Sequence, residues 1–180
     1  MPPRSGTALH VNAEHDMSAK EQFLKTMEEE HARTLRVLRA YPADKAEYRP
    51  DAKCKSARDV AWMFKLERGL GQTVLKGELG KGPMHKPPEA PAKWADIISG
   101  YEKAHQEYVA LVKSFSEQQL TEKVTFMTGP KQTGEVERMW FCWFLLHDEI
   151  HHRGQLSIYL RASGAKVPSI YGPSGDEPWM

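Results

Sequence analysis

Four segments of this chain repeat their apolar side chains every three or four residues, and this helical spacing constrains the fold more than any other feature. The segments carry start or stop signals, such as the Ser18-Ala-Lys-Glu21 capping box and the Gly164 that ends the last one. The predicted helices span residues 18–40, 56 to about 77, 92–115 and about 136–164. We therefore expect an all-α protein in which four helices bury their apolar faces against one another as a four-helix bundle.

The connections between these helices differ in length, which bears on their arrangement. The segment from about residue 78 to residue 91 is rich in Pro, Gly and Lys, and an extended chain of this length can cross the whole bundle. We therefore expect the second and third helices to run parallel. Val124-Thr-Phe-Met, followed by Thr128-Gly-Pro-Lys-Gln-Thr-Gly, predicts a small hairpin. The Pro- and Gly-rich tail that begins at Val167 holds enough apolar residues to pack back on the bundle.

The composition limits the classes of protein to which the chain can belong. Its 180 residues, with 25 Lys and Arg against 24 Asp and Glu, suit one globular domain with a formal charge of +1. This balance gives no electrostatic support for binding nucleic acid or an anionic membrane. The chain shows no membrane-spanning apolar run and no apolar signal segment, so we expect a cytoplasmic protein. Residues 1–17 are expected to be flexible and residues 18–180 to form the bundle, with Cys54 and Cys142 as reduced thiols.

The run His147-Asp-Glu-Ile-His151-His-Arg-Gly-Gln155 carries the strongest indication of chemistry. Two imidazoles four residues apart share one face of a helix, about 5–6 Å from each other at Cβ, which is the spacing that two ligands of one divalent metal need. The alternative is a pair of core histidines held by hydrogen bonds. His152 points about 100° away from His151, so we place it outside the ligand set. Gln155 can hydrogen-bond a ligand, and Gly154 suggests close approach of another helix.

The same run, continued by Tyr159-Leu-Arg-x-x-Gly164-x-x-Val-Pro168, resembles the C-terminal motif of the DinB-like family. The resemblance extends, more weakly, from Ser18 to about Pro173. It implies an up-down-down-up bundle, frequent dimers, and a divalent metal (zinc, nickel or iron) held by three histidines, of which two correspond to His147 and His151. It also implies a metal-dependent hydrolase or thiol transferase that acts on a small molecule.

The third histidine of the family pattern is replaced in this chain. The pattern places it about seven residues after the serine that opens the second helix, where Met63 offers a thioether, a poor ligand for zinc or nickel among imidazoles. Glu67 lies one turn further along the same stripe, and a carboxylate among apolar neighbours is costly unless it is paired or coordinated. We therefore predict His147, His151 and Glu67 as the metal ligands. The alternative is that Glu67 faces solvent, because the apolar residues of this helix do not fix its inner side.

Two Glu-x-x-His pairs, Glu102 with His105 and Glu149 with His152, allow a second interpretation. With Glu30 and Glu67 they make up the ligands of a ferritin-like di-iron bundle, provided that all of them project inward. Helical phase argues against this, because Glu149 and His152 are rotated by roughly 200° and 140° from His147. Other large or charged residues are expected to be structural: Trp94, Trp140, Trp143 and Cys142 in the core, and Glu28-Glu29-Glu30 on the surface.

Two classes of function follow from these residues. In the first, a metal held by His147, His151 and Glu67 lowers the pKa of a water or thiol and polarises a small substrate. In the second, the replacement of histidine by Met63 has removed the metal and leaves a dimeric helical bundle that binds a small molecule or a partner without chemistry. We expect a homodimer, with no nucleic acid or membrane as partner.

Overall fold

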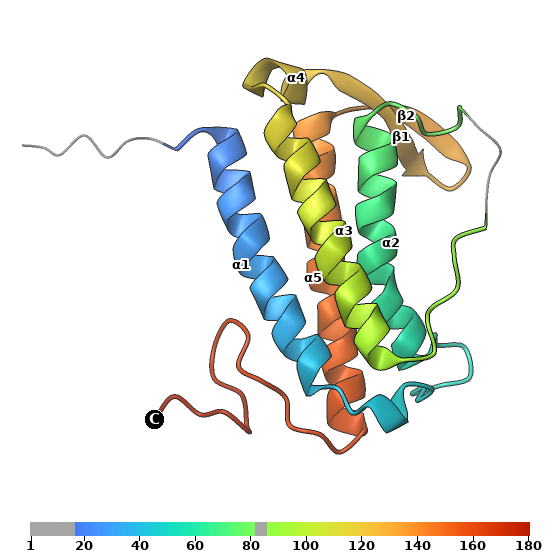
Figure 1. Ribbon diagram of the computed structural model, residues 1–180, viewed down its shortest axis with the longest axis vertical. Helices are drawn as coiled ribbons and strands as arrows, with labels where there is room; N and C mark the ends of the chain where they lie inside the picture. The colour runs from blue at the N-terminus through green and yellow to red at the C-terminus, as the bar shows by residue number, and fades with distance from the viewer. Residues whose placement is uncertain (1–16, 82–85) are drawn as a thin grey trace, which may run out of the picture.

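Four long helices dominate the structure, a computed structural model that describes residues 17–81 and 86–180 (Figure 1). They are α1 (Ala19–Ala40), α2 (Ala57–Leu75), α3 (Trp94–Ser114) and α5 (Arg138–Ala162), and each begins and ends within two residues of its predicted bounds. Ser18 and Ser56 cap α1 and α2 by accepting hydrogen bonds from backbone N–H groups of the first turn. A short 3-10 helix, η1 (Ala43–Lys45), lies between them. The expected flexible segment, residues 1–17, falls outside the described residues except for its last position.

The helices have the expected up-down-down-up order. α1 and α5 run in one direction and α2 and α3 in the other (Figure 1), with α2 packed against α3 and α5, and α1 packed against α5 and α3. The prediction that the second and third helices are parallel is confirmed. The Trp62 indole donates to the Pro88 carbonyl at 2.9 Å, which ties the long connection to α2. Gly71 lets α2 approach its neighbours closely, because a Cβ there would lie 2.5 Å from the Tyr108 ring.

A short helix and a hairpin join α3 to α5 and cover one end of the bundle (Figure 1). The hairpin consists of β1 (Lys123–Gly129) and β2 (Gln132–Glu137), paired antiparallel from Lys123 with Glu137 to Gly129 with Gln132. The predicted hairpin is therefore confirmed. Phe126 is buried and packs against Phe141 of α5, with ring centroids 4.7 Å apart. The helix α4 (Glu117–Thr121) was not expected, although a capping box opens it.

A buried carboxylate at the centre of the bundle joins all four long helices. Glu149 of α5 accepts hydrogen bonds of 2.7 Å from the hydroxyls of Thr34 in α1 and Tyr101 in α3, and it pairs with Arg68 of α2. Burial alone would raise the pKa of Glu149, but the Arg68 charge and the two hydroxyl donors hold the pKa below its ordinary value. The ionised carboxylate thus fixes the rotation of α5 about its own axis.

The tail after α5 lies back on the bundle, as expected. The Tyr171 hydroxyl donates to Glu30 Oε2 at 2.7 Å, and Arg153 Nη2 approaches the same oxygen at 2.6 Å. The expectation that Glu30 lies on the surface is therefore wrong. Its charge is tolerated in the interior because Arg153, itself buried, balances it.

The inner and outer faces of α5 differ from those expected from its apolar spacing. Trp140 is 51% exposed and Ile158 is 67% exposed, whereas Glu149 and Arg153 are buried. The expectation that Trp140 belongs to the core is wrong, because α5 carries large apolar residues around its whole circumference and ion pairing decides which of them face inward. Trp94 and Cys142 are buried, as expected, and both cysteines are free.

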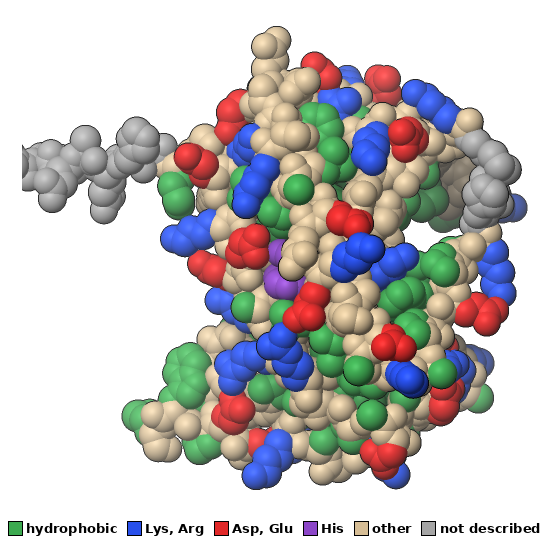
Figure 2. Space-filling view, viewed as in Figure 1, with side chains coloured by type: hydrophobic (Ala, Val, Ile, Leu, Met, Phe, Trp, Pro, Cys, Tyr) green, Lys and Arg blue, Asp and Glu red, His purple; other side chains and the backbone are tan. Residues whose placement is uncertain are grey.

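Two features of the described part of the chain are the length and apolar character of its helices and the distribution of charge on one face of the molecule. Within residues 17–81 and 86–180, no helix combines the length and apolar character needed to cross a membrane. Positive and negative side chains are intermixed over the face formed by α1, α3 and α2 (Figure 2). The observed distribution on this face agrees with the near-zero formal charge.

Candidate metal centre

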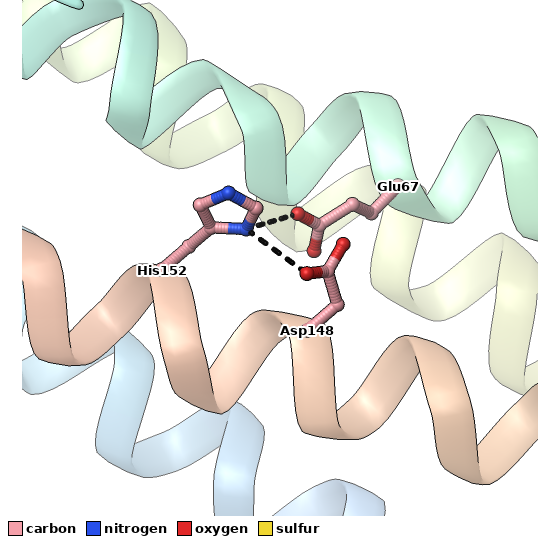
Figure 3. A group of neighbouring side chains, drawn as sticks. All are labelled: Glu67, Asp148 and His152. Atoms are coloured by element: carbon pink, nitrogen blue, oxygen red, sulfur yellow. Dashed lines mark ion pairs between the residues drawn. The ribbon is translucent and has the colours of Figure 1, made fainter. Parts of the chain in front are cut away.

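Three side chains that can ligate a metal meet between α2 and α5. Glu67 projects from α2, and Asp148 and His152 project toward it from successive turns of α5 (Figure 3). Each offers one oxygen or nitrogen atom, and these atoms all lie within 4.8 Å of one another. His152 Nδ1 is 2.7 Å from Glu67 Oε1 and 3.8 Å from Asp148 Oδ1. No other trio of His, Cys, Asp or Glu in the described part of the chain has this arrangement.

The protein does not satisfy the Glu67 carboxylate by hydrogen bonds. Glu67 is 3% exposed, and neither of its oxygens has a hydrogen-bond partner among the described residues. The contact with His152 Nδ1 is short but lacks hydrogen-bond geometry, so this ring nitrogen is also without a partner there. A buried charged group in this condition costs upwards of about 1–3 kcal/mol. The arrangement therefore leaves room for a further group, and the two carboxylates and one imidazole gathered here are ligand types that a divalent cation accepts.

The protonation of this group is poised near neutral pH. Burial raises the pKa of the Glu67 carboxyl to about 7, and the neighbouring His152 imidazole limits the rise. The approach of the Glu67 carboxylate in turn raises the pKa of His152 above its ordinary value. A metal ligand must give up its proton, so a divalent cation would compete with the proton that this pair holds.

A pocket of about 870 Å³ opens onto Glu67 and Asp148. One wall is apolar and consists of side chains of α2, namely Trp62, Met63, Leu66 and Leu70. Lys55 and Lys65 add positive charge, with Lys65 Nζ 5.2 Å from the centroid of the Trp62 ring. The connection before α3 supplies the opposite wall through Pro87 and Pro88. A small molecule with an apolar part can therefore reach Glu67 and Asp148, while His152 lines a second, neighbouring cavity of about 350 Å³.

The structure does not bring the predicted ligands His147, His151 and Glu67 together. Glu67 faces inward, as predicted, but His147 and His151 lie on the exposed face of α5. Their partners there are few: the Gln155 amide nitrogen is 2.8 Å from His151 Nε2, and the His147 ring lies 6.2 Å from that of Trp143.

Asp148 and His152 occupy the positions that the sequence predicts for His147 and His151. The difference is one residue of helical phase, or about 100° of rotation. His152 had been placed outside the ligand set, and no role had been predicted for Asp148. One signal was available, because Asp148 and His152 are themselves four residues apart and can share a helix face just as two histidines can.

Of the six residues of the di-iron interpretation, Glu67 and His152 belong to the candidate metal centre, and the other four are engaged elsewhere. Glu149 pairs with Arg68, Glu30 with Arg153, and Glu102 with Arg39 at 2.7 Å. His105 stacks on His31 with ring centroids 3.6 Å apart, and its Nε2 lies 3.1 Å from Glu28. The buried carboxylates near the centre thus stabilise the bundle through ion pairs. The argument from helical phase is wrong for α5, because Glu149 faces the bundle centre and His152 faces Glu67, whereas His147 is exposed.

Comparison with known proteins places the chain among similar bundles. A sequence model of the DinB family matches residues 17–179. The uncharacterized protein YrdA of Bacillus subtilis (strain 168) is 30% identical over 82 residues, which is 45% of this chain and 46% of that protein. The match thus spans about half the length of this curated relative.

Solved structures agree with this assignment at the level of the fold. A DinB-like protein from Bacillus cereus ATCC 10987 superposes with a TM-score of 0.67 at 22% identity, over 84% of this chain and 97% of that one. YfiT from Bacillus subtilis, described as a probable metal-dependent hydrolase with an unusual four-helix bundle topology, superposes with a TM-score of 0.60 at 13% identity, over 92% of this chain and 95% of that one. The family match over nearly all the described residues, together with this shared fold, shows that the chain belongs to the DinB family.

Proposed function

We propose that the protein is a metal-dependent enzyme that carries out hydrolysis or thiol transfer on a small molecule, with Glu67, Asp148 and His152 as the protein ligands of one divalent ion. The observation that carries the proposal is the buried Glu67 carboxylate, whose oxygens lack hydrogen bonds and face two further ligand atoms within 4.8 Å. The description of YfiT as a probable metal-dependent hydrolase supports the same class of activity.

The ligand types bear on which metal would be held. The family resemblance implies three imidazoles and suggests zinc, nickel or iron, whereas this group has two carboxylates and one imidazole. Carboxylates suit hard ions such as manganese(II), and imidazole suits iron(II) and zinc. Two carboxylates also balance the charge of a divalent ion inside the bundle. The additional carboxylate therefore adds manganese(II) to the ions that the family resemblance suggests, which are zinc, nickel and iron.

Each part of the site has a role in this proposal. A divalent ion, when bound, supplies Lewis-acid activation of a nucleophile and of the substrate. The apolar wall of Trp62, Met63 and Leu66 binds the uncharged part of the substrate and excludes water. The positive charge of Lys65, at the same pocket, attracts an anionic group of the substrate. Glu67, with a pKa of about 7, can hold or release a proton near neutral pH until the ion replaces it.

A titration with manganese(II) tests the ligand assignment. We expect tag-free protein to take up about one ion per chain, followed by the loss of the electron paramagnetic resonance signal of free manganese(II). Glu67→Gln should weaken binding by more than about tenfold, because an amide is a poorer ligand and lacks the charge. Glu89→Gln is the matched control, since Glu89 lines the same pocket but is 85% exposed and pairs with Lys86.

Two results would contradict the proposal. One is unchanged manganese(II) affinity in Glu67→Gln, and the other is the absence of uptake by wild-type protein. The latter would favour the second class of function, a bundle that binds a small molecule in the pocket without a metal. His152→Gln provides an independent check, because it removes the imidazole and leaves both carboxylates in place.

A further inference from the structure

The outer face of α5 presents six exposed residues along one line. They follow the heptad spacing of a coiled-coil seam and are Trp140, Phe144, His147, His151, Gly154 and Ile158. None of them carries a formal charge at neutral pH, whereas charged side chains of both signs cover the opposite face of the bundle (Figure 2). Trp140, Phe144 and Ile158 are 51%, 37% and 67% exposed. We call this line of residues the α5 seam.

The spacing of the α5 seam is the same in both directions, although the residue types differ. Its successive steps are 4, 3, 4, 3 and 4 residues, so its centre of symmetry lies at the level of Glu149. A second copy of α5 packed antiparallel about that level places Trp140 opposite the partner's Ile158, Phe144 opposite the partner's Gly154, and His147 opposite the partner's His151. Because the spacing is symmetric about this level, a two-fold pair can set every seam residue opposite another one, and each contact then occurs twice.

The sizes of the opposed residues are complementary. A Cβ built on Gly154 meets nothing within 4 Å, so the close approach that this glycine suggested does not occur within the described chain. The same gap is open to the Phe144 ring of a second copy. A cavity of about 350 Å³ lies beside Ile158, lined among others by Val60 and Tyr159, at the level that the indole of the partner's Trp140 would reach. Large residues thus face hollows on both sides of the centre.

We propose that two copies of this chain pair antiparallel through the α5 seam, and that the pairing gathers His147 and His151 of both copies into one zinc site. Neighbouring residues four apart on a helix are about 5–6 Å apart at Cβ, so each copy offers a two-imidazole clamp. Antiparallel pairing sets the two clamps face to face, which supplies the four nitrogen ligands that zinc favours in tetrahedral sites. The Gln155 amide near His151 Nε2 is an exposed contact at this face that zinc can displace.

Mass measurement with and without zinc tests the site. Sedimentation equilibrium at micromolar protein should show that zinc raises the fraction of dimer at least tenfold over the same protein in chelator. Wild-type protein should bind one more zinc ion per two chains than the double variant His147→Ala/His151→Ala. The double variant should also show no increase in mass when zinc is added. A zinc response retained by the double variant, or a monomer at every zinc concentration, overturns the proposal.

Further variants separate this site from the interior group. Glu67→Gln should keep the full zinc-dependent dimerisation, because the inference does not rest on the metal centre of the proposed function. Phe144→Glu should abolish the dimer by placing a charge in the seam, while Gln106→Glu, an equal charge on the exposed face of α3, should leave it intact. If Phe144→Glu and Gln106→Glu reduce the dimer fraction equally, the result would contradict the α5 seam as the dimer interface.

Cross-linking tests the register. In a Cys54→Ser background, Phe144→Cys and Gly154→Cys lie at the same level across the proposed interface. Two copies of either single variant would hold their new thiols about 15 Å apart along the helix axis, too far for a disulfide. Mild oxidation should therefore link the chains in a mixture of the two variants and in neither variant alone. Linkage within one variant, or none in the mixture, rules out this register.

Discussion

Replacement of Glu67 by glutamine should stabilise the metal-free protein at alkaline pH, even though it removes a proposed ligand. Burial raises the pKa of Glu67 from 4.5 to about 7, so the folded protein keeps this proton to a higher pH than the unfolded chain. The wild-type contribution is therefore fully present below pH 4.5 and is lost as pH rises through 7. At about 1.4 kcal/mol per pH unit, the interval from 4.5 to about 7 corresponds to a loss of about 3 kcal/mol in the free energy of unfolding.

Urea unfolding of wild type and Glu67→Gln at pH 4.5 and pH 8, both in chelator, measures this effect. An amide buried without partners carries a cost of its own, but that cost does not change with pH. We expect the variant to gain about 3 kcal/mol relative to wild type between the two pH values. Glu89→Gln, at an exposed position of the same pocket, should show no such gain. A difference between wild type and Glu67→Gln that is constant with pH would refute the reasoning.

Two further predictions concern the bundle that holds the site. Arg68→Met should cost about 3–5 kcal/mol in urea unfolding, because it leaves the Glu149 carboxylate buried without its cation. The double variant Arg68→Met/Glu149→Met removes both charges and should recover much of this loss of stability. If the double variant is instead less stable than Arg68→Met alone, the result would count against the ion pair. Gly71→Ala should cost about 1–3 kcal/mol, because its Cβ would lie 2.5 Å from the Tyr108 ring. Gly69→Ala meets nothing within 4 Å and should be neutral or stabilise by up to about 1 kcal/mol; equal losses at both glycines would contradict the close packing of α2.

Helix positions could be predicted from the sequence because their signals are local. The capping box at Ser18 and the serine at position 56 determine where α1 and α2 begin, whatever those helices pack against. The length of the connection before α3 was enough to predict that α2 and α3 are parallel. The hairpin followed from an extended apolar run and a turn that carries glycine at Gly129.

The rotation of α5 about its axis could not be predicted in the same way, and this rotation decides which side chains of α5 lie near Glu67. Apolar residues surround this helix, so its inner face depends on contacts made across the bundle. Glu149 faces inward because Arg68, Thr34 and Tyr101, on three other helices, satisfy it. The sequence contains each of these residues, but it does not indicate that their side chains contact one another in the folded bundle.

The inward orientation of Glu67 could be predicted from the sequence, whereas that of Asp148 and His152 could not. A carboxylate within an apolar stripe indicates an inward position by its cost alone, and Glu67 is indeed buried. On α5, two pairs of possible ligands have the same four-residue spacing. One pair is His147 with His151, and the other is Asp148 with His152. Only the pairing of Glu149, which lies between them in sequence, determines which pair faces Glu67.

The most direct test of the metal centre is a crystal structure of tag-free protein grown with manganese(II), with anomalous difference maps recorded for that metal. We expect one strong peak between α2 and α5, within coordination distance of an oxygen of Glu67, an oxygen of Asp148 and a ring nitrogen of His152. The absence of a peak at this group at saturating manganese(II), or a peak held by His147 and His151 of a single chain instead, would contradict the account.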